Sequence, residues 1–145
     1  MTLLFDNLGD QQKAFEKVEA ERHLMPGIPI LARLDGRAFS TFTRGLERPY
    51  DHRMSMCMLE TARHLLEQTH ARVVYVQSDE ITLGWDNTGT AIGINSFFSG
   101  RLQKMCSIFA GMASVKFNRL VSTYLPLEYS NKDPIFDCRV WQVPN

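Results

Sequence analysis

Apolar positions recur at helical spacing in three segments of the chain. The strongest stripe lies in residues 51–70, where apolar and small residues follow the i, i+3, i+4, i+7 pattern. A second stripe runs from about Ile94 to Tyr124, and a weaker amphipathic pattern covers residues 10–24, with Asp10 as a candidate N-cap. The sequence therefore predicts three helices, of which the two with strong stripes contribute to the core.

Four shorter segments have the composition of strands. The continuous apolar run 28–34 predicts a strand buried on both faces. Residues 72–77 and 81–85 are separated only by Ser78-Asp79-Glu80, the spacing of a hairpin with a tight turn. Residues 135–143 alternate between two kinds of side chain, which is typical of a strand with two different faces.

After the first helix, the predicted elements follow the order β-α-β-β-α-β. This order is typical of a ferredoxin-like α+β fold, in which a four-stranded antiparallel sheet carries its two main helices on one face. The chain has 145 residues, of which 44% are hydrophobic and 22% charged, and we expect them to form a single domain over 1–145.

Charge and cysteine content limit the partners and the cellular compartment that the sequence predicts. The formal net charge is zero, so any contact with a polyanion has to be local. Cys57, Cys106 and Cys138 form no C-x-x-C pair, which indicates neither a disulfide framework nor a zinc site. There is no signal-peptide pattern and no apolar stretch long enough to span a bilayer, so we expect a cytoplasmic protein without a membrane partner.

Two aspartates are the first candidates for chemistry. In the predicted topology the first strand lies beside the central hairpin, so Asp35 at the end of that strand and Asp79 in the hairpin turn converge. Neighbouring carboxylates repel each other unless a cation lies between them, and Mg²⁺ prefers such hard oxygen ligands. Asp35, Asp79 and the carbonyl of Gly36 are therefore a candidate magnesium site. The alternative is that both segments are ordinary turn signals.

Two cations are candidates for a triphosphate site. Arg101 and Lys104 lie three residues apart near the start of the long helix, where free backbone N–H groups also favour anions. We expect both to face the same cavity and to bind the triphosphate. The alternative is a solvated helix face, which the spacing permits equally well.

Four motifs, in this order along the chain, resemble those of the tRNA-His guanylyltransferase family and its relatives that repair tRNA 5′ ends. They are RLDGRAF (33–39), QSDE (77–80), GRLQKMCS (100–107) and FDCRV (136–140). The resemblance extends from about Pro29 to Val143 and implies a polymerase palm, in agreement with the predicted sheet. It further implies a metal-dependent nucleotidyltransferase that adds nucleotides in the 3′-to-5′ direction to the 5′ end of a tRNA, with GTP or ATP, two Mg²⁺ ions and a homo-oligomeric, tetrameric assembly.

The resemblance also implies roles for individual residues. Asp35, Asp79 and Glu80 would be catalytic, with Asp35, Gly36 and Asp79 binding metal. The implied nucleotide-binding residues are Gly36, Arg37, Ala38, Phe39, Ser40, Arg48, Ser78, Arg101, Lys104 and Ser107. Arg48 stands where the family often has lysine. Family members continue into a C-terminal region that helps to position tRNA, and we expect this chain to correspond to the palm alone.

Two other functions are compatible with the sequence. Another palm-type enzyme, such as a diguanylate cyclase, would share the topology and the acids, but it should have a glycine-glycine-acid-acid hairpin where this chain has Ser78-Asp79-Glu80. A nucleotide-binding or assembly module without catalysis is the second alternative. The sequence does not distinguish tRNA-His from other tRNAs with truncated 5′ ends.

Overall fold

The computed structural model describes residues 2–87 and 97–144. The elements in chain order are α1 (Thr2–Ala20), β1 (Ile30–Gly36), α2 (Phe39–Phe42), α3 (His52–Thr69), β2 (Val73–Gln77), β3 (Glu80–Trp85), the 3₁₀ turn η1 (Phe97–Gly100), α4 (Leu102–Tyr124), α5 (Leu127–Ser130) and β4 (Phe136–Gln142). No helix within the described ranges is both long enough and apolar enough to cross a membrane.

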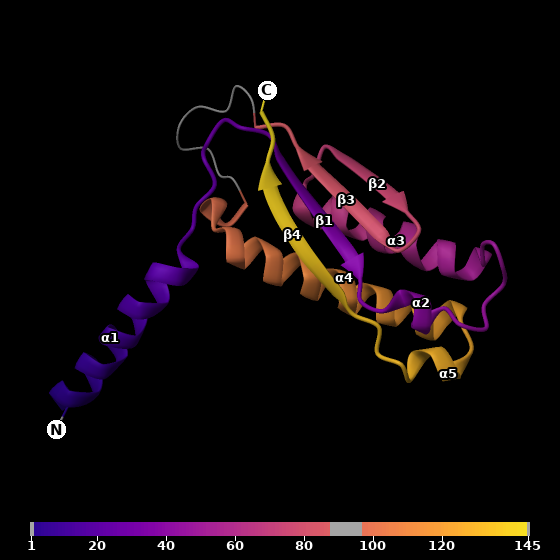
Figure 1. The fold of residues 1–145 in the computed structure, drawn as a ribbon, viewed down its shortest axis with the longest axis horizontal. Helices are drawn as coiled ribbons and strands as arrows, with labels where there is room; N and C mark the ends of the chain where they lie inside the picture. The colour runs from indigo at the N-terminus through magenta and orange to yellow at the C-terminus, as the bar shows by residue number, and fades with distance from the viewer. Residues whose placement is uncertain (1, 88–96, 145) are drawn as a thin grey trace.

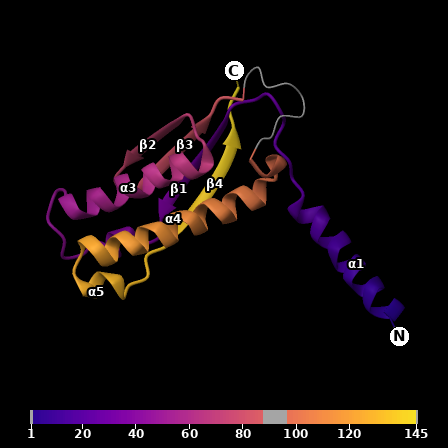
Figure 2. The same cartoon turned by 180° about the vertical axis from the view of Figure 1, so that it is seen from behind.

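The strands form one four-stranded antiparallel sheet in the order β2-β3-β1-β4. Helices α3 and α4 pack against each other on one face of this sheet, and among the described elements no long helix covers the opposite, open face (Figures 1 and 2). The predicted ferredoxin-like α+β fold is thereby confirmed. The two edges of the sheet are β2 and β4.

The central strand β1 has two different faces. Buried and half-buried residues alternate along it. The helices cover Ile30, Ala32 and Leu34, whereas the charged residues Arg33 and Asp35 are only half-buried. The prediction of a strand buried on both faces is therefore wrong. Arg33, the one charged member of the predicted strand, was the sign of a second, polar face. Helices cover only one side of the sheet, so Arg33 and Asp35 reach the open face.

The two core helices follow the predicted stripes, with one boundary changed. The buried residues of α3 are Cys57, Met58, Thr61, Ala62, Leu65 and Thr69. Helix α4 begins at Leu102 rather than near Ile94, because Phe98 and Ser99 have left-handed φ angles of 52° and 56° and interrupt the helix before it. The remainder of the predicted start, 94–96, lies outside the described residues.

Helix α1 projects away from the sheet and is not part of the core (Figure 1). It begins at Thr2 and ends at Ala20, so Asp10 lies inside the helix instead of capping it. Phe15 and Val18 are exposed on this helix. The prediction of a helix over 10–24 holds as far as Ala20. Leu24, the last member of the predicted apolar stripe, lies beyond the helix and packs against the core.

An aromatic cluster fixes the chain where β1 ends. The ring of Phe39 lies 5.1–5.3 Å, between ring centroids, from Phe42, Phe117 and Phe136. A Cβ atom added to Gly36 would meet this ring at 2.5 Å. Glycine is thus required here because the core phenylalanine packs directly against the backbone.

We expect Gly36→Ala to lower the free energy of unfolding by about 1–3 kcal/mol, because the added methyl group displaces the Phe39 ring. The matched control is Gly111→Ala in α4, where an added Cβ meets no atom within 4 Å. That substitution should stabilise the protein by roughly 0.5–1 kcal/mol through helix propensity. Urea unfolding measures both changes, and an unchanged stability of Gly36→Ala would contradict this packing.

Candidate active site

Acidic side chains gather at the end of β1 on the open face of the sheet. Asp35 pairs across the ladder with Glu80 of β3 on one side and with Asp137 of β4 on the other. Asp79 lies in the two-residue turn next to β3, and its carbonyl accepts a hydrogen bond from the Gly36 amide at 3.1 Å. The structure therefore brings Asp35 and Asp79 together, as the topology predicts, and adds a further acid.

The surroundings of Asp35 raise the pKa of its carboxyl group. Partial burial is the largest cause that raises the pKa of this carboxyl above its ordinary value, followed by the negative charges of Asp79, Asp137 and Glu80, while Arg139 lowers it. The ionised carboxylate is thus disfavoured by its surroundings. A divalent cation would remove the conflict, and carboxylate oxygens are the ligands that Mg²⁺ prefers.

The residues present fit a magnesium ion that keeps other ligands. Within residues 2–87 and 97–144, no group of three or more His, Cys, Asp or Glu side chains is placed to hold a metal ion. Mg²⁺ commonly takes only one or two carboxylates, together with water and substrate phosphates. Asp35, Asp79 and the Gly36 carbonyl therefore remain a sufficient candidate set.

A cavity of about 480 Å³ opens beside Asp79, between α2, the following loop, the start of α3 and the β2–β3 turn. This volume lies within the usual range for small-molecule sites. The predicted site residues that line it are Phe39, Ser40, Arg48, Ser78 and Asp79. Arg37 and Ala38 are exposed at the start of α2 and are not part of the lining.

The wall of this cavity depends on Asp51, whose role the sequence analysis missed. Its carboxylate is 5% exposed and accepts hydrogen bonds from the amides of Glu47 at 3.2 Å and Arg53 at 2.9 Å. The Arg53 side chain pairs with it at 2.8 Å and is the largest cause that holds the pKa of Asp51 well below its usual range. The signal was an aspartate directly before the strongest helical stripe, which is an N-cap pattern.

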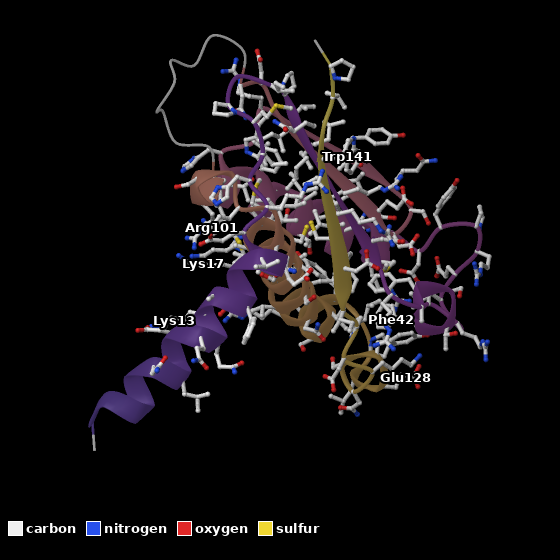
Figure 3. All side chains as sticks on the ribbon, turned by 60° about the vertical axis from the view of Figure 1, so that its left-hand side comes forward. Lys13, Lys17, Phe42, Arg101, Glu128 and Trp141 are labelled. Atoms are coloured by element: carbon white, nitrogen blue, oxygen red, sulfur yellow. The ribbon has the colours of Figure 1, made fainter. Side chains whose placement is uncertain are left out.

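A second cavity, of about 740 Å³, lies between α1 and α4. Arg101, Lys104 and Ser107 line it together with Lys13 and Lys17 of α1. Figure 3 shows Lys17 and Arg101 on these two neighbouring elements. Four basic side chains therefore share one groove with three acids, Glu16, Glu21 and Asp137.

Arg101 and Lys104 face the same cavity, as predicted, but that cavity is not the one that Asp79 lines. Helix α4 runs antiparallel to β4, because the Phe136 amide at the start of that strand donates to Ser114, well along the helix. Arg101 consequently lies at the other end, where it pairs with His23 ahead of β1. Helical spacing placed the two cations on one face of a helix but could not say which end of the sheet that face reaches.

The two cavities nevertheless approach the same strand. Asp137 lines the second cavity and is the direct cross-strand neighbour of Asp35. The acid cluster thus lies between the nucleotide-sized cavity and the cation-lined groove. A family profile described as Thg1, tRNAHis guanylyltransferase, matches residues 10–144. The chain belongs to the tRNAHis guanylyltransferase family.

Known proteins are similar to most of this chain. "Uncharacterized protein R259" of Acanthamoeba polyphaga mimivirus is 35% identical over 154 residues, which cover 95% of this chain and 52% of that protein. A bacterial tRNA(His) guanylyltransferase (Thg1)-like protein in complex with GTP matches with a TM-score of 0.87 and 32% identity. The match covers 95% of this chain and 64% of the bacterial protein.

Two further solved structures are similar. A bacterial tRNA(His) guanylyltransferase (Thg1)-like protein in complex with ATP matches with a TM-score of 0.83 and 32% identity. The match covers 94% of this chain and 59% of the bacterial protein. The enzyme from Saccharomyces cerevisiae matches with a TM-score of 0.74 over 90% of this chain and 57% of that one, and at 19% identity it supports the fold alone. The chain therefore spans about half of the curated relative and under two thirds of the solved proteins.

We expect Asp35→Asn to raise the melting temperature of the metal-free protein at neutral pH, because it removes a carboxylate that its neighbours repel. A raised pKa in the folded state costs stability above the ordinary value of 3.8, so the difference should shrink as the pH falls toward that value. Added Mg²⁺ should stabilise the wild type more than the variant. Thermal melts from pH 4 to 8 measure both effects.

The matched control is Glu19→Gln, which removes an exposed carboxylate from α1. It should leave both the melting temperature and the response to Mg²⁺ unchanged. Equal stabilisation of wild type and Asp35→Asn by Mg²⁺ would contradict a metal site at this carboxylate.

Proposed function

We propose that this chain is the palm of a metal-dependent nucleotidyltransferase that adds nucleotides in the 3′-to-5′ direction to the 5′ end of a tRNA. The observation that carries the proposal is Asp79 in the wall of a nucleotide-sized cavity, with the carboxylate of Asp35 close enough to interact with it. Family membership supports it, as do relatives whose structures contain GTP or ATP. GTP or ATP and a tRNA are accordingly the proposed substrates.

Asp35 and Asp79, with the carbonyl of Gly36, would hold two Mg²⁺ ions. Bound there, the ions would supply charge neutralisation for the triphosphate and activation of the attacking hydroxyl group. The protein contributes the close, partly desolvated arrangement of the two carboxylates. Glu80 strengthens the local negative potential from the neighbouring strand, which favours cation binding.

The cavity beside Asp79 would hold one nucleotide. The hydroxyl groups of Ser40 and Ser78 are exposed at its wall and can donate to phosphate oxygens, and Arg48 offers a planar pair of donors suited to phosphate. Arg53 is less available because it is paired with Asp51. Gly36, Arg37 and Ala38 lie just outside the lining, where the backbone passes from β1 to α2.

The groove between α1 and α4 would hold the second phosphate-bearing substrate. The reaction joins two such substrates, and a single cavity beside Asp79 serves only one of them. Arg101, Lys104 and Ser107 retain their proposed nucleotide-binding role, with Lys13 and Lys17 added from α1. The position of Asp137 between this groove and Asp35 supports a path from the groove to the acid cluster.

The proposed setting is a cytoplasmic homo-oligomer. Free cysteines, with Cys57 fully buried, fit a reducing compartment. Exposed Leu8, Phe15 and Val18 on α1 support burial against another subunit. A palm-type cyclase is disfavoured because the hairpin lacks the paired glycines, and a module without catalysis would bind nucleotide but transfer nothing.

We expect GTP to bind this chain only in the presence of Mg²⁺. Asp79→Ala should abolish this Mg²⁺-dependent binding. Arg48→Ala should weaken GTP binding by about tenfold to a hundredfold, the scale of a charged hydrogen bond. Isothermal titration measures the affinity, and transfer of labelled GTP to a 5′-monophosphate tRNA measures the activity. The control is Arg119→Ala, an exposed arginine of α4.

Equal GTP affinities for Arg48→Ala and Arg119→Ala would contradict the assignment of the cavity. Mg²⁺-dependent GTP binding without any transfer to RNA would support the non-catalytic module instead.

A further inference from the structure

The open face of the sheet carries three rows of side chains that run across the strands. The first row is the acid row, Glu80-Asp35-Asp137, which belongs to the candidate active site. The second, arginine row is Thr82-Arg33-Arg139, and the third, apolar row is Gly84-Leu31-Trp141. Successive rows are two residues, or about 7 Å, apart along each strand.

The arginine row contains an electrostatic conflict that the described chain does not resolve. Arg33 and Arg139 are direct cross-strand partners, an arrangement in which like charges destabilise a sheet. Asp137 pairs with Arg139 at 3.5 Å. Among the residues that the structure describes, no acid pairs with Arg33, and its buried Nε atom has no hydrogen-bond partner. An anion placed between the two guanidinium groups would offset this cost.

The apolar row offers surface for a flat ring next to that anion site. Trp141 lies half-buried on β4 (Figure 3). The Arg33 guanidinium lies over its ring, 5.8 Å from the ring centroid. On the edge strand β2, Tyr75 and Val73 are 60% and 58% exposed and continue the arginine and apolar rows. Stacking on aromatic side chains and phosphate contacts to arginine are together the usual means of binding single-stranded nucleic acid.

We propose that the open face of the sheet binds a single-stranded segment of RNA that runs along β1 from the acid row to Trp141. One backbone phosphate lies between Arg33 and Arg139, and the adjoining base stacks against Trp141. This inference rests on the proposed function, because the acid row is where the RNA end would react. It adds an RNA-binding surface whose arginine and apolar rows line neither of the two cavities described above.

The occupant is a polynucleotide rather than a free nucleotide because of where the rows lie. The free nucleotide has its own cavity beside Asp79, and the lining of that cavity includes no residue of the arginine or apolar row. The acid row at one end repels phosphate unless Mg²⁺ is present, so binding of RNA along the whole face should depend on Mg²⁺. Zero net charge leaves these local contacts to supply the affinity.

Tryptophan fluorescence tests the surface directly, because the chain has 2 tryptophans in different surroundings. Trp141 lies on the open face, whereas Trp85 is stacked on Phe109 and donates to the Thr69 carbonyl at 2.9 Å on the covered side. A single-stranded ten-nucleotide RNA with Mg²⁺ should quench the wild type. Trp141→Phe keeps the emission of Trp85 and should show no quenching.

The affinity and its salt dependence supply the second readout. Trp141→Ala should weaken RNA binding by about tenfold, the loss of one stacked base. Arg33→Gln and Arg139→Gln should each flatten the slope of log affinity against log salt by about 0.7, the value for one phosphate contact of a single strand. Arg119→Gln on α4 is the matched control and should leave the slope unchanged.

RNA binding with unchanged Trp141 fluorescence would overturn the inference and locate the RNA elsewhere. Equal quenching by GTP alone would also overturn it, because the face would then be a nucleotide site. Mg²⁺-dependent GTP binding, measured on the same samples, separates the two proposals. If it persists while the RNA readouts fail, only the RNA surface is wrong, and if it is absent from the wild type, the proposed function is wrong.

Discussion

The antiparallel pairing of β1 with both β3 and β4 decides where the charged groups of the open face lie. This register sets Asp35 between Glu80 and Asp137 and sets Arg33 beside Arg139. The acid row and the arginine row each place like charges next to one another, which lowers the stability of the protein without ligands. The acids are suited to a cation and the arginines to an anion, so the same charges that destabilise this face allow it to bind a metal ion and a phosphate chain.

The rest of the fold holds this costly face in place. A cluster of phenylalanines packs directly on the backbone of Gly36 and so fixes the turn that follows Asp35. Asp51 closes the adjoining loop with hydrogen bonds to backbone amides and to Arg53. The phenylalanine contacts lie on the covered side of the sheet, so they stabilise β1 without involving the charged side chains of the open face.

The position of α4 separates the candidate phosphate-binding groups into two places. The helix runs antiparallel to β4, so its first turns lie beside α1 and away from the β2–β3 turn. Arg101 and Lys104 therefore face a groove of their own, with Asp137 between it and Asp35. A reaction between two phosphate-bearing substrates is compatible with such an arrangement, since each substrate would approach the acids from its own side.

Periods of 3.6 and 2 residues and short connections are local properties of the chain. They were enough to predict the helix over 51–70, the hairpin around Ser78 and Asp79, the order of elements along the chain and the nearness of Asp35 to the turn. They did not predict that β1 has an open face, that Arg33 meets Arg139, or that Arg101 lies far from the β2–β3 turn. Those facts depend on strand register and on the docking of whole helices, which bring together residues distant in sequence, and no local pattern encodes such pairings.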